Sequence, residues 1–427
     1  MSCLSVQSFR KALRSTVQGI PLLFKNSLEY KVFPDIHSIA PELWNSLNFS
    51  KSIFLEHSTL KALGGHTEID NTLFHYVVFY NKSLPVGIAV VQIAQLRAQN
   101  LEERISTGKW GSMISNRFLP KGKPAYILVC GSIFSTGEHG FSFDPSLPMQ
   151  QCMNGLCEAL TEISDAFASQ GNALSAWLVK DFYGENFDKT KGLEKCYFKP
   201  FDVDHNMEMP LLSEWESFDD YLNALNTKFR TKANAALKRS SSLHVKSLQA
   251  KDIEPLQERM GELYDAVFTK ADFKIGKLDC SKLCELKRSM KDRMIVRGYY
   301  LEEKLIGFST ALIAENQLEA FMVGIDYQFN QEHAMYSRML YDYIQLGIER
   351  KKTRIIFGRT AGEIKSSVGA FPVALKCCIK HPGKLPNVLL SVIFKYIEPT
   401  AIPIRRPYKE VTLRKIVSTH PRYSHEV

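Results

Sequence analysis

The sequence lacks the long apolar runs that would place it in a membrane. No stretch of its 427 residues approaches the ~20 apolar residues of a spanning helix, and the best candidate, 388–394, stops at Lys395. The basic and acid-free start, 1–14, has no apolar core of the kind found in a secretory signal. We therefore expect no transmembrane span, and the start of the sequence does not match a secretory leader.

Motifs for metal binding and for nucleophilic hydrolysis are also missing. The nine cysteines are scattered, without a C-x-x-C repeat or spaced histidines, which argues against a zinc site. No Gly-x-Ser-x-Gly is present, and no Gly-Lys-Ser/Thr follows the Gly-rich segment 130–141. We expect no metal, and we expect cysteines that stay reduced in the cytoplasm.

The composition is that of a globular protein with more than one domain. Hydrophobic residues make up 45% of the chain and charged residues 23%, close to globular averages. A chain of 427 residues is too long for one ordinary core, so two domains are expected. The formal net charge of +9 is compatible with anionic ligands such as coenzyme A, tRNA or phosphorylated precursors, and it does not choose among them.

The hydrophobic pattern changes period along 293–365 and predicts an α/β unit. Three β-rich runs separated by short polar turns predict a meander, and apolar residues at three- and four-residue spacing then predict an amphipathic helix. The predicted order is strand 294–300, strand 305–313, strand 318–326, helix 334–351 and strand 353–358. Such a unit forms a mixed sheet with a ligand-sized opening where the helix begins.

This order resembles the acyl-CoA N-acyltransferase core of the GNAT superfamily. The segment 357–370, FGRTAGEIKSSVGA, is similar to the Gly-rich, Lys-containing segment that closes the second lobe of Fem-related acyltransferases. The resemblance implies an α/β fold of two tandem GNAT-like lobes, each a mixed sheet flanked by helices. In Fem-related proteins the first lobe is often structural, so we interpret segment 130–141 as structural first and acceptor-binding second.

The first half of the chain repeats the same order of elements. A polar insertion at 97–123 interrupts strands at 73–80, 86–93 and 125–131, which are followed by a helix at 149–169 and a strand at 173–179. The expected organisation is an N-terminal arm at 1–29, a first lobe at 30–205, a second lobe with the donor site at 206–385 and a C-terminal extension at 386–427.

A helix with a strongly basic face is predicted at the junction of the lobes. Ser217 can cap its start together with Asp220, and an apolar stripe follows. Its basic residues are Lys228, Arg230, Lys232, Lys238 and Arg239. Fem-related proteins carry a similar helix before the second lobe. The face is either a solvated helix surface or a site that contacts phosphate.

The resemblance also implies a site for the acyl donor. GNAT enzymes bind the donor pyrophosphate on backbone N–H groups at the start of the crossover helix, where the helix dipole favours an anion. The matching positions are Gln331, His333, Ala334 and Met335. Ala334 and Tyr336 replace the two expected glycines, and their side chains hinder close approach of a pyrophosphate. A plain helix N-terminus is the alternative interpretation.

Acyl transfer to an amine also needs a proton acceptor and a proton donor. Many GNAT enzymes carry the base on the third strand, where this chain has Glu319 and Asp326; seven residues apart, they face opposite sides, so at most one can serve. We assign Asp326, with a strand-end residue bonding to loop amides as the alternative. Tyr336 is the candidate acid and Tyr341 a second, although both could simply pack.

The loop after the last strand carries the most specific group of polar residues. Arg359 could bind a carboxylate or phosphate, with Thr360 and Glu363 beside it, and Lys365 could supply a positive charge to a developing oxyanion. The alternative is an ion pair between Arg359 and Glu363 that fixes the loop.

The resulting hypothesis is an enzyme that transfers an acyl group from acyl-CoA, a co-substrate, to an unidentified amine, without a bound cofactor. The first alternative is a Fem-type aminoacyltransferase that uses aminoacyl-tRNA in cell-wall precursor synthesis, which the basic helix fits. The second is a non-catalytic GNAT-like binding protein, which the missing glycines fit. Binding of DNA is not expected.

Overall fold

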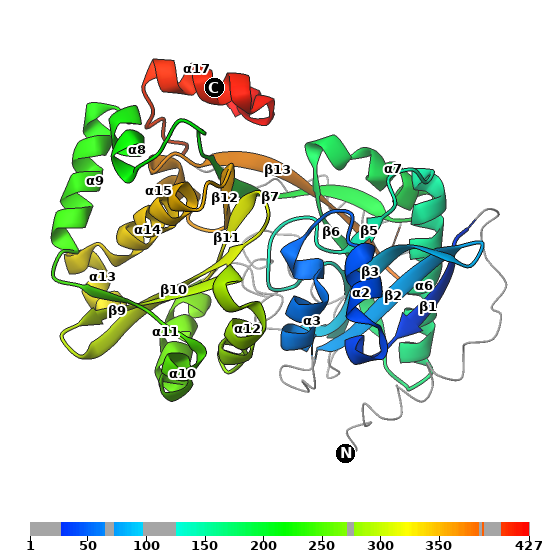
Figure 1. The fold of residues 1–427 in the computed structure, drawn as a ribbon. Coiled ribbons are helices and arrows are strands. Elements are labelled where there is room, and N and C mark those ends of the chain that lie inside the picture. The colour runs from blue at the N-terminus through cyan, green and yellow to red at the C-terminus, as the bar shows by residue number, and fades with distance from the viewer. Residues whose placement is uncertain are drawn as a thin grey trace, which may run out of the picture. The chain divides into compact units, whose positions relative to one another are not determined.

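Figure 1 shows the computed structural model of the chain, and the structure describes residues 27–64, 72–96, 125–270, 277–383, 387 and 403–426. The predicted arm up to residue 26 and the polar insertion 97–123 lie outside these residues. The chain divides into two compact units, between Val203 and Asp204 and again between Ala374 and Leu375. Residues 375–383 thus group with the first unit and 403–426 with the second, whereas the sequence expectation placed 206–385 in one lobe and 386–427 in an extension.

The first unit is built on a mixed sheet. Its strand order is β1-β2-β3-β4-β6-β13, with β5 paired to β3, and β4 and β6 run parallel while β2 and β3 form an antiparallel hairpin. The strands are β1 (Glu29–Phe33), β2 (Leu73–Asn81), β3 (Leu84–Leu96), β4 (Ala125–Cys130), β5 (Phe141–Phe143), β6 (Leu174–Tyr183) and β13 (Phe371–Lys380). The helices of four or more residues are α2 (Pro41–Ser46), α3 (His57–Gly64), α6 (Met149–Ala168) and α7 (Asp188–Glu194).

Both faces of the first-unit sheet are apolar because successive side chains of its strands point to opposite faces. Val77 and Phe79 of β2 pack into a cluster with Leu156 of α6. The intervening Tyr76 and Val78 pack on the other face, in a cluster that includes residues of α2 and α3. The sheet is therefore covered by helices on both sides, as in other layered α/β folds.

The second unit repeats this architecture. Its strand order is β7-β12-β11-β10-β9-β8, with β11 and β12 parallel and the remaining described neighbours antiparallel. The strands are β7 (Lys199–Pro210), β8 (His244–Ser247), β9 (Met294–Leu301), β10 (Lys304–Ile313), β11 (Gln317–Ile325) and β12 (Arg354–Gly358). The helices are α8 (Phe218–Ala224), α9 (Thr227–Arg239), α10 (Ala250–Ile253), α11 (Gln257–Thr269), α12 (Lys282–Met290), α13 (Tyr327–His333), α14 (Met335–Glu349), α15 (Gly362–Ser367) and α17 (Glu410–Thr419).

The junction helix predicted from the sequence is divided in the structure. Its start is confirmed, because the Ser217 side chain accepts from the Asp220 N–H and the Asp220 carboxylate accepts from the Ser217 N–H. The helix then stops at Leu225, whose backbone is extended and bridges to Tyr408, before α9 begins. A single apolar stripe could not reveal this break, because the bridge partner lies 183 residues further along the chain.

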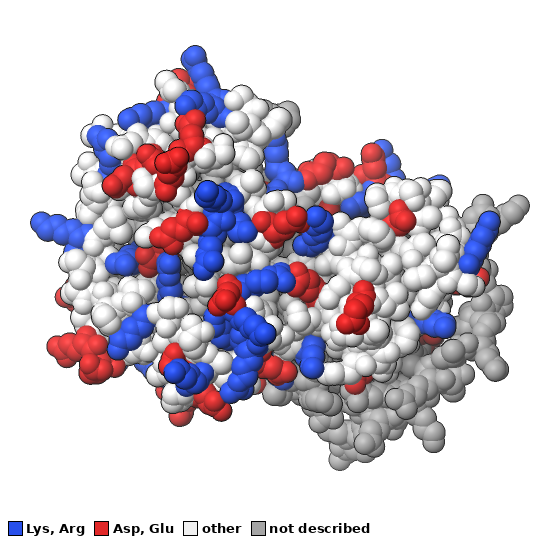
Figure 2. Space-filling model, in the orientation of Figure 1, with Lys and Arg blue, Asp and Glu red and all other residues white. Residues whose placement is uncertain are grey.

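Charged side chains of both signs are mixed on one face of the molecule (Figure 2). On the face shown in Figure 2, Lys and Arg side chains are interspersed with Asp and Glu side chains, so the positive excess does not form one continuous field there. Within the described parts of the chain, no helix is both long and apolar enough to span a membrane.

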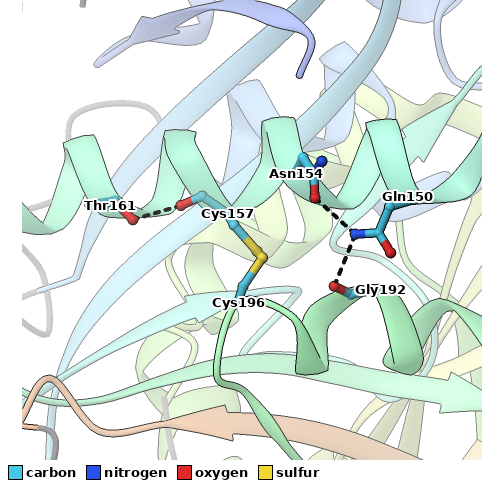
Figure 3. Close-up of a disulfide and its surroundings, with 6 residues drawn as sticks. All are labelled: Gln150, Asn154, Cys157, Thr161, Gly192 and Cys196. Carbon is cyan, nitrogen blue, oxygen red and sulfur yellow. Dashed lines mark hydrogen bonds between the residues drawn. A yellow bond between two sulfur atoms is a disulfide. The ribbon is translucent and has the colours of Figure 1, made fainter. Parts of the chain in front are cut away.

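The expectation of reduced cysteines was wrong for one pair in the first unit. Cys157 of α6 and Cys196, which follows α7, form a disulfide (Figure 3). The Gln150 amide spans the same two helices, because its Nε2 lies 2.8 Å from Asn154 Oδ1 and 3.4 Å from the Gly192 carbonyl oxygen. The sequence separation of 39 residues gave no sign of this pairing, which depends on how α7 packs against α6.

Candidate functional site

The two parallel strands of the second unit pair over only a short length. Hydrogen-bonded partners run from Gln317–Arg354 to Glu319–Ile356, although β11 continues to Ile325. In the first unit, by contrast, β4 pairs with β6 as far as its last residue, Cys130. The second unit therefore leaves most of one edge of β11 unpaired with β12, at the place where the sequence predicted an opening.

A shift of register accompanies the end of this pairing. Between β10 and β11 the register changes around Ser309–Ala311. Thr310 stabilises the irregularity, because its Oγ1 accepts from the Met322 N–H at 2.7 Å and donates to the Met322 carbonyl at 3.1 Å. Such a bulge increases the local twist of the strands.

Glu319 lies at the last residue pair before β11 and β12 part. Its side chain is 4% exposed, and its Oε1 lies 2.5 Å from Nε2 of Gln317. Burial raises the pKa of this carboxyl to about 8; the Gln317 hydrogen bond opposes the rise, the charge of Glu208 adds to it and Arg354 opposes it. A carboxyl that titrates near neutral pH in this position can accept a proton from a bound group.

Asp326 is held in structural contacts. Its Oδ1 accepts from the Gln328 N–H at 3.2 Å and so caps α13, and its Oδ2 accepts from Arg259 Nη2 at 2.8 Å. These contacts match the alternative interpretation of a strand-end residue bonding to loop amides. The sequence favoured Asp326 because it borders the predicted opening. A carboxylate inside an otherwise apolar strand is the sequence signal that could have pointed to Glu319.

The predicted donor loop folds partly as a helix of its own. Gln331 and the buried His333 belong to α13, and Ala334 then adopts a left-handed conformation with φ 47° before α14 begins. Met335 is buried, and a Cβ added to Gly307 would meet its methyl group at 2.4 Å. The Asn330 Oδ1 accepts from the Tyr336 N–H at 3.0 Å, so a first-turn donor of α14 already has a partner.

The two candidate tyrosines of α14 keep their protons. Burial and the nearby Tyr327 raise the pKa of Tyr336. Burial raises the pKa of Tyr341 to about 12, and its ring packs against Phe218 and Tyr221. Tyr341 therefore serves the contact between α14 and α8.

Lys365 is directed at the end of β12. The side chain is 3% exposed, and its Nζ donates to the carbonyl oxygens of Phe357 at 2.7 Å and Gly358 at 3.2 Å. Burial lowers the pKa of Lys365 to about 7. The amino group thus donates to strand-end carbonyls that the short strand leaves without a ladder partner on β11.

The loop that the sequence singled out surrounds this lysine. Arg359 is half-buried and Thr360 is exposed. Glu363 accepts from Arg405 Nε at 3.1 Å, so its charge is engaged by a residue that precedes α17. Arg405 is far from Glu363 in the sequence, and the sequence reasoning missed this pairing for that reason.

The basic residues of α9 lie on its solvent side. The helix packs through Ala233 and Ala236, while Lys228, Lys232, Lys238 and Arg239 are exposed and Arg230 is half-buried. Two of the cations contact neighbouring elements: Lys232 Nζ lies 3.4 Å from Ser367 Oγ of α15, and Arg239 Nε donates to the Glu332 carbonyl at 3.1 Å. α9 thus places positive charge beside both α15 and α13.

The Gly-rich loop of the first unit is held by groups within that unit. Lys180 Nζ lies 3.1 Å from Asp181 Oδ2 and donates to the Ser132 carbonyl at 2.6 Å, and both side chains are buried. Burial and the charge of Lys180 lower the pKa of His139 to about 4, so this histidine is neutral at pH 7. These contacts suit a structural loop. Among the residues that the structure describes, no group of three or more His, Cys, Asp or Glu side chains could hold a metal.

The arrangement of elements is shared with solved structures. A tandem GNAT protein from the clavulanic acid biosynthesis pathway aligns over 84% of this chain and 99% of its own, with a TM-score of 0.50 and 8% identity. This chain has a tandem GNAT fold. FemX aligns over 91% of this chain and 98% of its own, with a TM-score of 0.47 and 11% identity. L-PGS from Bacillus licheniformis aligns over 84% and 97%, with a TM-score of 0.45 and 11% identity.

At these identities the likeness of the tandem GNAT protein concerns the fold alone. It confirms the predicted fold class and the predicted repeat: β2, β3, β4, α6 and β6 of the first lobe correspond to β9, β10, β11, α14 and β12 of the second. No family model matches the sequence, and neither does any curated protein.

Proposed function

We propose that the protein is an acyltransferase whose second GNAT lobe transfers an acyl group from an activated carrier, a thioester in the case of acyl-CoA, to an amine. The observation that supports this most is the edge of β11 beyond Glu319, which does not pair with β12. An extended carrier arm containing amide groups can add to such an edge through backbone hydrogen bonds. The acyl carbonyl would then lie close to Glu319.

In this proposal Glu319 is the catalytic base and replaces Asp326 in that role. With acyl-CoA, the amine nitrogen attacks the thioester carbonyl and Glu319 accepts the nitrogen's proton. The carbon–sulfur bond then breaks, the leaving thiolate takes up a proton from water, and Glu319 returns its proton to the solvent. A base that titrates near pH 8 binds the proton strongly enough to drive this step and is still partly ionised at neutral pH. Lys365 supports the site indirectly, because it fixes the end of β12 through the carbonyls of Phe357 and Gly358.

Acyl-CoA is the proposed donor, with aminoacyl-tRNA as the second candidate. The exposed cations of α9 favour the second donor, because a polynucleotide can contact several of them at once. The Asn330 contact with the Tyr336 N–H favours it as well, since a coenzyme A pyrophosphate would have to displace it. If neither donor binds, the alternative of a non-catalytic binding protein is favoured.

The test is a transfer assay with acetyl-CoA, longer acyl-CoAs and charged tRNA, each offered with a panel of primary amines. Glu319→Gln is expected to lower kcat by about 100-fold or more, the scale of a lost general base, with an unchanged melting temperature. Asp326→Asn is the matched control, and it is expected to lower the melting temperature through its lost contact with Arg259 while turnover persists. If Asp326→Asn lost turnover and Glu319→Gln kept it, Asp326 and not Glu319 would be the base.

A further inference from the structure

Two buried carboxyl groups of the second unit lie on the same face of its sheet. Glu208 of β7 and Glu319 of β11 both pair with Ile356 of β12, one from each side. Directly paired residues of neighbouring strands project to the same face, and two strand spacings separate their Cα atoms by roughly 10 Å. Glu208 is 0% exposed and Glu319 is 4% exposed, so the interactions of both carboxyl groups are poorly screened.

The C-terminal segment provides the main partners of Glu208. This segment consists of α17 and the short helix η8 (Pro421–Glu426). Glu208 Oε2 accepts from Arg422 Nη1 at 3.0 Å and from the Tyr423 hydroxyl at 3.2 Å. The Tyr423 ring stacks on Phe371, which lies at the start of β13 and belongs to the second unit, with centroids 5.2 Å apart and 23° between the planes; this contact holds the hydroxyl in place.

A continuous set of polar contacts then connects Glu208 with Glu319. Arg354 Nη1 lies 3.6 Å from Glu208 Oε2, and Arg354 Nε donates to Gln317 Oε1 at 2.8 Å. The Gln317 amide nitrogen in turn contacts Glu319 Oε1 at 2.5 Å. The carboxyl pair therefore has two guanidinium groups nearby, those of Arg354 and Arg422, and Arg422 belongs to the C-terminal segment.

The other titratable and polar groups around the pair come from the same elements. Nδ2 of Asn206, a residue of β7, lies 3.4 Å from Glu208 Oε1. Burial first, and then the charges of Arg354 and Arg422, lower the pKa of His420, which makes this side chain neutral at pH 7. Burial and the Glu208 charge raise the pKa of Tyr423, so Tyr423 remains a hydrogen-bond donor. The charge balance at the pair thus depends on Arg354 and Arg422.

We propose that the C-terminal segment is part of the acyltransferase site, where Arg422 and Tyr423 hold Glu208 as a charged neighbour of Glu319. The inference rests on the proposed role of Glu319 as the base. Glu208, Arg422 and Tyr423 touch no reacting atom and are positioning residues. The Glu208 charge opposes ionisation of Glu319, which makes Glu319 a stronger proton acceptor than an ordinary exposed glutamate. The Arg422 charge and the Tyr423 hydroxyl limit this effect, because both stabilise the carboxylate form of Glu208.

The direct test is difference infrared spectroscopy of the protonated carboxyl band in the full chain, recorded against pH. The double variant Glu208→Gln/Glu319→Gln is the blank, so that the difference reports these two groups only. Glu208→Gln is expected to move the titration midpoint down by about one pH unit or more, because Glu319 loses a negative neighbour. Arg422→Gln is expected to move the midpoint up, because the carboxyl pair loses a cation. Arg422→Lys should return it toward the wild-type value.

Tyr423→Phe keeps the ring on Phe371 and removes only the hydroxyl, so it tests the inference in a variant that folds. It is expected to move the midpoint up by less than Arg422→Gln does. A segment that only stabilises the fold would lower the melting temperature of the Arg422 and Tyr423 variants and leave their midpoints at the wild-type value, and that result would overturn the inference.

The transfer assay separates this inference from the proposed function. Midpoints that move in the expected opposite directions, combined with an absence of acyl transfer from every donor, would support the link between the C-terminal segment and Glu319 and overturn the acyltransferase assignment alone. Transfer that requires Glu319, combined with unmoved midpoints, would support the assignment and overturn the inference.

Discussion

Lys365 shows how burial changes the role that a residue's chemistry suggests. The sequence placed this lysine where a positive charge could stabilise an oxyanion, and the structure directs its Nζ at the carbonyls of Phe357 and Gly358. A buried amino group needs such acceptors, because it has lost its water. Its first effect is therefore on the shape of the loop after β12.

Replacing this lysine should expose its structural contribution. Lys365→Met keeps most of the buried side-chain volume but leaves the carbonyls of Phe357 and Gly358 without this donor. We expect a loss of about 1–3 kcal/mol in the free energy of unfolding. Chemical denaturation at pH 8 measures it. Lys232→Met, which replaces an exposed lysine that contacts the same helix, is the control and should cost far less. Equal stability of the two variants would contradict this role.

The same lysine predicts a pH dependence of stability. Its folded pKa of about 7 lies below the ordinary value of 10.5, so between these values the unfolded chain binds more protons than the folded chain. Stability should therefore rise with pH from about 7 to 10, by up to about 1 kcal/mol per unit from this group. Lys365→Met should lack that rise. A wild-type curve parallel to that of the variant would show that the lysine titrates normally.

At the scale of elements, the start of α14 decides how an anionic donor could bind. The left-handed Ala334 and the Asn330 contact with the Tyr336 N–H occupy the place where the resemblance implied a glycine-bearing phosphate loop. Alanine in this conformation costs about 1–2 kcal/mol relative to a right-handed residue. Where the resemblance implied an open loop, this chain has the short helix α13 followed by the left-handed Ala334.

Freeing this helix start should strengthen coenzyme A binding. Asn330→Ala leaves the Tyr336 N–H open, and adding Ala334→Gly lets a phosphate approach the backbone, so we expect affinity to rise by about 1 kcal/mol, the net worth of one hydrogen bond. Calorimetric titration with coenzyme A measures it. Asn48→Ala, which removes a comparable contact with Ser52 in the first unit, is the control. Unchanged affinity in the double variant would place the pyrophosphate elsewhere.

The disulfide between α6 and the end of α7 should stabilise the first unit measurably. Cross-links of this loop length contribute about 2–4 kcal/mol, mainly by restricting the unfolded chain. Reductant should lower the melting temperature of the wild-type protein and of Cys152→Ala, which removes a free thiol from the same helix. Cys157→Ser/Cys196→Ser should melt at the lower temperature with or without reductant. A wild-type protein indifferent to reductant would contradict the bond.

At the scale of the whole molecule, the two GNAT lobes differ in what fills the end of their parallel strands. In the first lobe the pairing runs to the end of β4, and the buried Lys180 and Asp181 hold the loop that follows. In the second lobe the pairing ends at Glu319. The contrast supports the proposal that the donor binds in the second lobe and that the first lobe is structural.

A variant of the first lobe tests that division of roles. Lys180→Met leaves Asp181 buried without its cation, and we expect a loss of about 3–5 kcal/mol in stability. Donor affinity, measured below the unfolding transition, should not change. Lys180→Met/Asp181→Asn should recover part of the stability, because it removes the unpaired charge. A fall in donor affinity of the folded Lys180→Met protein would place donor contacts in the first lobe.

The sequence by itself determined the order and type of the elements. Strand alternation, helical spacing and the Ser217–Asp220 cap depend on residues within a few positions of one another, and the structure confirms the repeated meander, crossover helix and returning strand. The likeness to the GNAT core followed from that order together with segment 357–370.

Tertiary structure alone decided the contacts between distant residues. The end of pairing at Glu319, the Cys157–Cys196 bond and the approach of Arg422 to Glu208 depend on how elements far apart in the chain pack together. Local periodicity carries no information about such partners, and a carboxylate's partners determine its proton affinity. For this reason the sequence could place Glu319 and Asp326 on one strand, and only the packed structure distinguished a buried carboxyl near the strand opening from an ion-paired helix cap.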